Sequence, residues 1–202
     1  MAKDHFTSTG LTTPEMMAET LKYRHEFQIA HVDRVDIVAI LEFKLVERYP
    51  NFRLVIVRDD ELKEDAVTEP HNDRIVVRRS LYRAACDEDP VARFVLAHEL
   101  GHYLLHRERN VQMHKDPNGA VQRFKHMNAR ESTEDQADMF ARHFLLPPHI
   151  AFEHREQPEV LAARTGVPLR ISRGNITMSK WQEVHSLRLA ARRSTQQGLL
   201  DL

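Results

Sequence analysis

Two histidines and a glutamate in one short stretch carry the clearest chemical signal in this chain. The stretch His98-Glu99-Leu100-Gly101-His102 has the pattern H-E-x-x-H. On a helix, its two histidines lie one turn apart on the same face, so both imidazoles can reach one metal ion. Glu99 then points roughly 100° around the helix, beside the metal without taking a ligand position. Two ligands and a base from one helical turn are typical of a zinc peptidase site.

The surrounding sequence predicts that this helix is buried. Residues 93–106, RFVLAHELGHYLLH, are apolar on nearly every side, which is typical of a helix inside a core. Asp89 and Pro90 supply a cap and a proline at the first helical position. Polar groups buried without partners are costly, so the polar side chains of the motif need a ligand or one another.

A catalytic zinc site needs a third protein ligand, and the same helix does not supply it. A metzincin would have glycine and histidine where this chain has Leu105 and Glu108. His106 continues the histidine face, but it lies about 12 Å of helix rise beyond His98. We therefore interpret His106 as a supporting or capping residue and expect the third ligand elsewhere.

Residues 131–147, ESTEDQADMFARHFLLP, predict a second helix with an acidic first turn. Thr133 is expected to cap this helix. Apolar residues recur at helical spacing, and the small side chains of Ala137 and Ala141 would let it pack closely against the first helix.

Glu134 and Asp138 share one face of this second helix, one turn apart. Glu134 could complete a site with two histidines and one glutamate. Asp138 could accept the outward N–H of a ligand histidine and so fix its orientation. Glu131 is the alternative third ligand.

The two motifs together resemble the ImmA/IrrE family of metallo-endopeptidases, also called the IrrE N-terminal-like domain. The resemblance rests on RFVLAHELGHYLLH followed by E-x-x-A-D-x-F-A-x-x-x-L-L-x-P, and it covers about residues 18–150. It implies a small gluzincin-like fold in which zinc is bound by His98, His102 and Glu134, with Glu99 as the catalytic residue. It also implies a protein substrate, namely a helix-turn-helix repressor that controls a mobile element or a stress response.

Composition predicts a soluble globular protein. The chain has 202 residues, is 42% hydrophobic and has a net charge of −1, so no overall basic field favours nucleic-acid binding. The single cysteine, Cys86, allows no internal disulfide and favours a reducing compartment. The N-terminus lacks an apolar signal core, and no long apolar run could span a membrane. We expect a cytoplasmic protein with no membrane partner; the oligomeric state is not specified.

The predicted fold class is α+β and zincin-like, with residues 1–150 as the metallopeptidase domain. Helices are expected on one face of a small antiparallel sheet of about three strands, which precedes the active-site helix. The strands are expected at 51–57, near Val67 and at 74–78. Residues 108–130, which include His114 and His126, predict a long loop.

Residues 151–202 are predicted to form a helical C-terminal extension. They hold 8 Lys and Arg against 5 Asp and Glu, a charge of +3, whereas residues 1–150 carry −4 from 21 and 25. Residues 160–168 look like the opening of a helix-turn-helix, and DNA contact would use residues 158–175. Because +3 is little charge for a groove binder, we favour helices packed on the catalytic domain over direct DNA contact.

The strand Arg74-Ile75-Val76-Val77-Arg78 is the predicted substrate-binding edge. A peptidase must present an extended backbone, and adding the substrate as a strand to a free sheet edge achieves this. Charged residues that bracket a β-branched run are typical of edges that stay unpaired when idle.

The sequence therefore predicts a zinc-dependent endopeptidase in which Glu99 takes a proton from water and passes it to the leaving amine. Two alternatives stay open. One is a zinc-stabilised sensor or binding module that acts through partner binding. The other is a DNA-binding regulator that uses residues 158–175.

Overall fold

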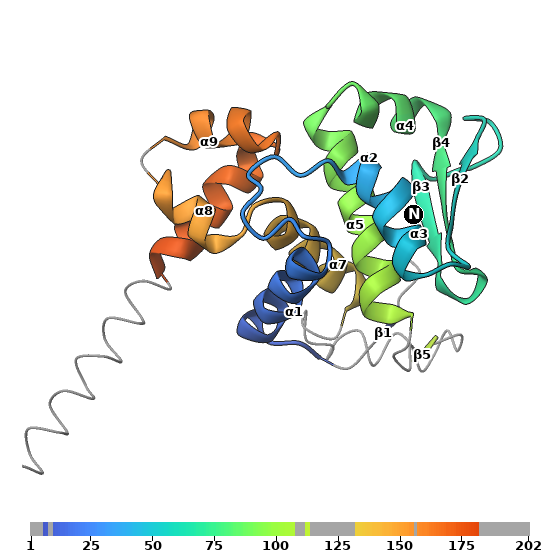
Figure 1. The fold of residues 1–202 in the computed structure, drawn as a ribbon, viewed down its shortest axis with the longest axis horizontal. Coiled ribbons are helices and arrows are strands. Elements are labelled where there is room, and N and C mark those ends of the chain that lie inside the picture. The colour runs from blue at the N-terminus through green and yellow to red at the C-terminus, as the bar shows by residue number, and fades with distance from the viewer. Residues whose placement is uncertain (1–5, 8–9, 108–111, 114–131, 156, 182–202) are drawn as a thin grey trace, which may run out of the picture.

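The fold places one long helix between a small sheet and a group of helices. The structure is a computed structural model and describes residues 6–7, 10–107, 112–113, 132–155 and 157–181. In Figure 1, helix α5 (Pro90–His106) runs through the middle of the molecule, with the sheet on one side and helices α1 and α7 on the other. The predicted α+β class, with helices against a small three-stranded sheet, is confirmed.

The sheet is mixed, so the predicted antiparallel sheet is wrong for one of its two strand pairs. Its order is β2 (Arg53–Val57), β4 (Arg74–Arg78), β3 (Ala66–Glu69). Strands β3 and β4 form an antiparallel hairpin, whereas β2 runs parallel to β4. The chain forms β2 and then β3 at the two edges of the sheet. It then forms β4 in the space between these two strands. Strands β2 and β3 are therefore consecutive in the sequence but not neighbours in the sheet.

Strand β4 is the central strand, which corrects the predicted substrate-binding edge at Arg74, Ile75, Val76, Val77 and Arg78. Each of these residues has a β2 partner, and all but the last also have a β3 partner. Ladder positions that are already filled on both sides cannot accept a further strand. The charged ends of β4, which suggested an edge strand, form ion pairs instead. Arg74 pairs with Glu69 at the end of β3, and Arg78 pairs with Asp65 just before β3.

Local sequence signals explain several helix starts. Helix α1 (Thr13–Glu26) begins with a capping box between Thr12 and Glu15. The second helical stretch is capped by Asp36 and contains a π-helical turn, in the order α2 (Ile37–Ala39), η1 (Ile40–Lys44) and α3 (Leu45–Arg48). Helix α4 (Arg79–Cys86) leads into α5, whose first turn is capped by the Asp89 side chain as expected.

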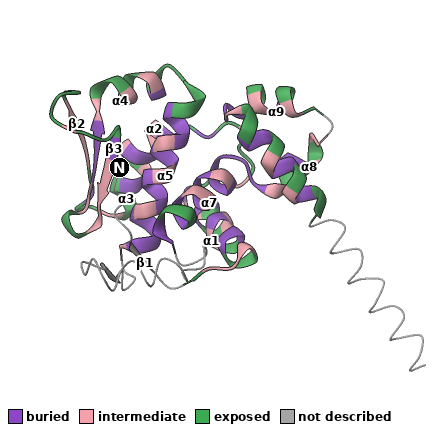
Figure 2. Ribbon diagram, turned by 180° about the vertical axis from the view of Figure 1, so that it is seen from behind, coloured by how far each residue is buried: buried purple, intermediate pink, exposed green. Residues whose placement is uncertain are grey.

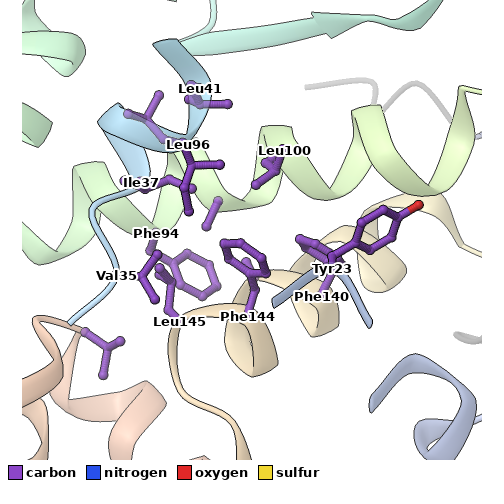
Figure 3. Close-up of a cluster of buried hydrophobic side chains, with 14 of the residues drawn as sticks. Tyr23, Val35, Ile37, Leu41, Phe94, Leu96, Leu100, Phe140, Phe144 and Leu145 are labelled. Carbon is purple, nitrogen blue, oxygen red and sulfur yellow. The ribbon is translucent and has the colours of Figure 1, made fainter. Parts of the chain in front are cut away.

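Close packing between α5 and α7 (Thr133–Leu145) forms the centre of the core. Figure 3 shows Leu96 and Leu100 of α5 facing Phe140 and Phe144 of α7, and all four side chains are fully buried. The two phenylalanine rings stack with centroids 5.2 Å apart, and the ring of Tyr23 from α1 meets Phe140 edge-on. Figure 2 shows that buried residues follow α5 along most of its length. The apolar sequence around the motif is thus explained by burial.

The described part of the C-terminal segment is helical. It comprises α8 (Pro148–Glu153), α9 (Pro158–Thr165) and a helix over residues 169–181. Its apolar side chains belong to the same cluster as those of α5 and α7: Ile150, Leu161, Val167, Ile171 and Ile176. The guanidinium of buried Arg93 donates to the backbone oxygens of Thr165 and Gly166 and so ties α5 to the end of α9.

Several predicted features lie outside the described residues. The predicted loop at 108–130 does so except for a short strand, β5 (Gln112–Met113), which pairs with β1 (Phe6–Thr7). Among the described helices, none is both long enough and apolar enough to cross a membrane.

Candidate metal centre

Three side chains from two helices converge on one point. The Nε2 atoms of His98 and His102 lie 3.0 Å apart. The Glu134 carboxylate lies 3.4 Å from the first and 3.3 Å from the second. Ligands about 2.0–2.1 Å from a tetrahedral zinc ion would be roughly 3.3 Å from one another. The spacing of these three groups therefore fits a shared metal ion.

Helix α5 supplies the two histidines from adjacent turns of one face. Their ring centroids are 4.7 Å apart, and both side chains are about one-sixth exposed, at 17% and 16%. Most of α5 is buried, so these rings mark where its surface opens towards solvent. Such partial access is what a catalytic site needs and what a closed structural zinc site lacks.

Helix α7 brings in the third group through a capped first turn and a close helix crossing. Ser132, rather than the predicted Thr133, caps the helix by accepting a hydrogen bond from the Asp135 amide. Gly101 faces Ala137 at the crossing, and a Cβ atom on the glycine would lie 3.2 Å from the alanine backbone. The absence of a side chain at Gly101 thus lets α7 approach closely enough for Glu134 to reach the histidines.

Asp138 lies directly behind His98, with its Oδ1 2.9 Å from the ring Nδ1. Burial disfavours the charged imidazole, but hydrogen bonds to Asp138 and Glu134 outweigh it and raise the pKa of His98 to about 9. The hydrogen bond from His98 in turn lowers the pKa of Asp138. This is the arrangement in which a carboxylate fixes the orientation and increases the basicity of a histidine ligand.

Glu134 is held in its ionised form. Hydrogen bonds from His102 and His98 hold the pKa of its carboxyl far below the ordinary glutamate value. Two imidazole nitrogens and one carboxylate oxygen, with a second carboxylate behind one ring, form a donor set that zinc accepts in catalytic sites. The residues present therefore fit a zinc ion.

The carboxylate of Glu99 contacts strand β3. Only 8% of the residue is exposed, and its Oε2 accepts a hydrogen bond of 2.6 Å from the Thr68 hydroxyl. Sequence reasoning missed Thr68, because no local pattern marks a threonine on a strand as the partner of a helix residue. Only the strand order, which places β3 beside α5, brings the two side chains together.

Other candidates have different positions. The predicted substrate strand Arg74–Arg78 lies in the middle of the sheet. Tyr103, the residue after the second histidine, is fully buried and donates a 2.9 Å hydrogen bond to Asp73 at the end of the hairpin turn. Glu131, the alternative third ligand, lies outside the described residues.

A comparison with protein families agrees with the resemblance inferred from the motifs. A family model described as the IrrE N-terminal-like domain, a peptidase family, matches residues 55–172, which is more than half of the chain. A solved structure of a Mycobacterium tuberculosis transcriptional regulator is similar at 18% identity with a TM-score of 0.48. That similarity covers 79% of this chain but only 45% of the regulator, so this chain spans less than half of its length. No curated protein matches the chain.

Proposed function

Because this chain belongs to the family of the IrrE N-terminal-like domain, we propose that it is a zinc-dependent endopeptidase acting on protein substrates. The family supports a metallopeptidase-like role in general terms. The proposal of a zinc-dependent reaction rests on one observation, the convergence of His98, His102 and Glu134. Glu99 follows the first of these ligands on α5. Partly exposed ligands beside a buried carboxylate suit catalysis better than a purely structural metal site.

In the proposed mechanism, His98, His102 and Glu134 hold the ion through two imidazole nitrogens and one carboxylate. Zinc bound there would lower the pKa of a water molecule and polarise the scissile carbonyl. Glu99 takes the proton from the attacking water and delivers it to the nitrogen of the leaving amine. Thr68 restrains one oxygen of Glu99, which leaves the other for proton transfer.

The substrate is proposed to bind as an extra strand along β3. In the described part of the chain, β3 is the strand of the sheet nearest α5, and no strand pairs with its outer edge. Strand addition would present an extended backbone next to Glu99, because Thr68 of this strand contacts that carboxylate. A scan of N-methylated peptide bonds in a cleaved peptide tests this mode. Loss of cleavage at alternate positions supports strand addition, and equal sensitivity at neighbouring positions contradicts it.

The proposed substrate class is a helix-turn-helix repressor with a locally extended segment, in the cytoplasm, which would link the peptidase to a mobile element or a stress response. This assignment rests on the family resemblance. Purified protein mixed with candidate repressors and analysed for new N-termini by mass spectrometry would test it. Cleavage confined to unrelated denatured proteins would count against it.

The reaction itself is tested with Glu99→Gln and Glu134→Ala, each compared with the wild-type protein. The first change removes the base but no ligand, so we expect full zinc content and nearly complete loss of proteolysis. The second removes a ligand, so we expect loss of zinc and of proteolysis together. Proteolysis by Glu99→Gln at the wild-type rate would rule out the proposed mechanism.

The two alternative functions receive less support from the described contacts. A DNA-binding regulator that uses residues 158–175 would need the arginines of that segment to reach DNA. Arg164 instead pairs with Asp33, and Arg173 pairs with Glu159. Arg170 lies over the ring of Phe94, 5.7 Å from its centroid. Charges used in this way favour packing of the C-terminal helices over groove binding. A binding module without turnover would retain its cellular effect in Glu99→Gln, which separates it from a peptidase.

A further inference from the structure

A second imidazole lies directly behind the ligand His102. His106, one turn further along α5, is 4% exposed, and its Nδ1 lies 3.4 Å from the Nδ1 of His102. On its other side, the Nε2 of His106 lies 3.1 Å from the Oε1 of Gln136, which is 2% exposed on α7. The three side chains form a continuous chain of hydrogen bonds from the metal centre into the α5–α7 interface.

The chemistry of His102 at one end and Gln136 at the other fixes where the protons lie in this series of hydrogen bonds. His102 directs its Nε2 towards His98 and Glu134, so a ligand role requires a lone pair there and a proton on Nδ1. At the far end, the Oε1 of Gln136 can only accept, so His106 carries its proton on Nε2. The Nδ1 of His106 is then an acceptor and faces the Nδ1–H of His102. This assignment satisfies both contacts with a neutral imidazole.

The two ligand histidines are therefore supported in different ways. His98 donates to the carboxylate of Asp138, whereas His102 donates to an uncharged imidazole. Glu134 and Glu99 already add two carboxylates around the same point, and a further buried anion behind His102 would add repulsion. A neutral chain can fix the ring of His102 without adding negative charge to the centre.

We propose that His106 and Gln136 are positioning residues that set the tautomer and ring orientation of His102 and thereby strengthen zinc binding. The inference rests on the proposed ligand role of His102, but it does not depend on proteolysis. Gln136 acts through His106 in this scheme, because its Oε1 lies 3.1 Å from the Nε2 of that imidazole.

The test measures the zinc dissociation constant of the full chain by competition with a chromophoric chelator. We expect Gln136→Met and His106→Leu each to weaken binding about 10–100-fold, as changes behind a ligand usually do. The double variant should bind no more weakly than His106→Leu alone, because Gln136 is proposed to act through the imidazole. His106→Asn places an oxygen near the former Nδ1, so this variant should bind zinc more tightly than His106→Leu.

The thermal midpoint of each metal-free variant separates positioning from general stability. A merely structural role would lower the midpoint without preferential loss of zinc affinity, and His106→Asn would not restore binding. Wild-type affinity in both apolar variants, or fully additive losses in the double variant, would overturn the inference. Failure of the wild-type chain to bind zinc would overturn the proposed function as well, whereas zinc binding without proteolysis would leave the inference standing.

Discussion

Gly101 of α5 faces the backbone of Ala137 of α7 so closely that a Cβ atom on the glycine would lie 3.2 Å from both the Cα and the carbonyl oxygen of the alanine. Backbone atoms of a packed helix cannot move aside as a flexible side chain can. The separation of the two helices at this crossing therefore depends on a single missing side chain.

Substitution of Gly101 by alanine is expected to weaken zinc binding about tenfold, because α7 and its ligand Glu134 must move away from α5. Alanine has the higher helix propensity, so a propensity effect alone would act in the opposite direction on stability. The control is Gly174→Ala, where the nearest atom to the added Cβ is a side-chain nitrogen of Arg142 at 3.6 Å. Chelator competition on both variants gives the comparison, and equal affinities would show that the crossing tolerates a methyl group.

Asp138→Asn is expected to weaken zinc binding about 10–100-fold and to reduce the protons released on binding. In the metal-free protein the pKa of His98 is raised to about 9, so its imidazole is protonated at neutral pH and must lose a proton to become a ligand. Near neutral pH we expect about one proton released per zinc bound by the wild-type protein. Without the Asp138 charge the pKa of His98 falls and fewer protons are displaced. An indicator dye in weakly buffered solution measures the release, and an unchanged value would contradict the role of Asp138.

Thr68→Val is expected to lower kcat about tenfold with little change in KM or zinc content. Valine has nearly the same shape but lacks the hydroxyl that lies 2.6 Å from Glu99, so the base loses its restraint while the strand keeps its form. Thr68→Ser keeps a hydroxyl and should recover most of the rate. If serine and valine behave alike, the hydrogen bond to Glu99 does not matter for turnover.

His143 is expected to make the protein sensitive to mild acid. Its side chain is buried in α7, and neither ring nitrogen has a hydrogen-bond partner among the residues that the structure describes. Burial lowers its pKa from 6.5 to about 4. The unfolded chain therefore binds this proton first, and the stabilising contribution present above about pH 6.5 is lost as the pH falls towards 4. The loss between about pH 7.5 and about pH 5 amounts to about 2 kcal/mol.

His143→Met removes this titration. The difference in unfolding free energy between those two pH values should therefore be smaller than in the wild type by about 2 kcal/mol. The control, His71→Gln, changes an exposed histidine and should leave the wild-type pH dependence in place. Denaturant unfolding of the metal-free proteins makes the comparison without interference from zinc. The same pH dependence in His143→Met and wild type would show that another group causes the acid sensitivity.

The parts of the site that the sequence predicts best depend on contacts within one helix. His98 and His102 are brought together by helical spacing alone, and the caps of α1 and α5 follow from single residues. The placement of Glu134 needed a further assumption, that two helices pack through small residues, and the structure provides that packing at Gly101.

The parts that sequence reasoning missed depend on pairing between distant segments. A run such as Arg74–Arg78 has the same composition at the centre of a sheet as at its edge, and only its partners distinguish the two positions. The contact between Thr68 and Glu99 follows from that same pairing, since it requires β3 to lie beside α5. Burial from both sides, rather than edge protection, explains the β-branched residues of β4.

The parallel pairing of β2 with β4 has a consequence for how the chain assembles. Strands β3 and β4 are joined by a single 3-10 turn, η2 (Pro70–Asn72), and Asp73 in a left-handed conformation with φ of 49°. Hairpins of this kind close in about 1–10 μs. Arg53 and its partner Arg74 are 21 residues apart in the chain, so β2 must close a larger loop to dock. We therefore expect the β3–β4 hairpin to form first and β2 to pair with it afterwards. The strand farthest from the metal centre is then the last of the three to join the sheet.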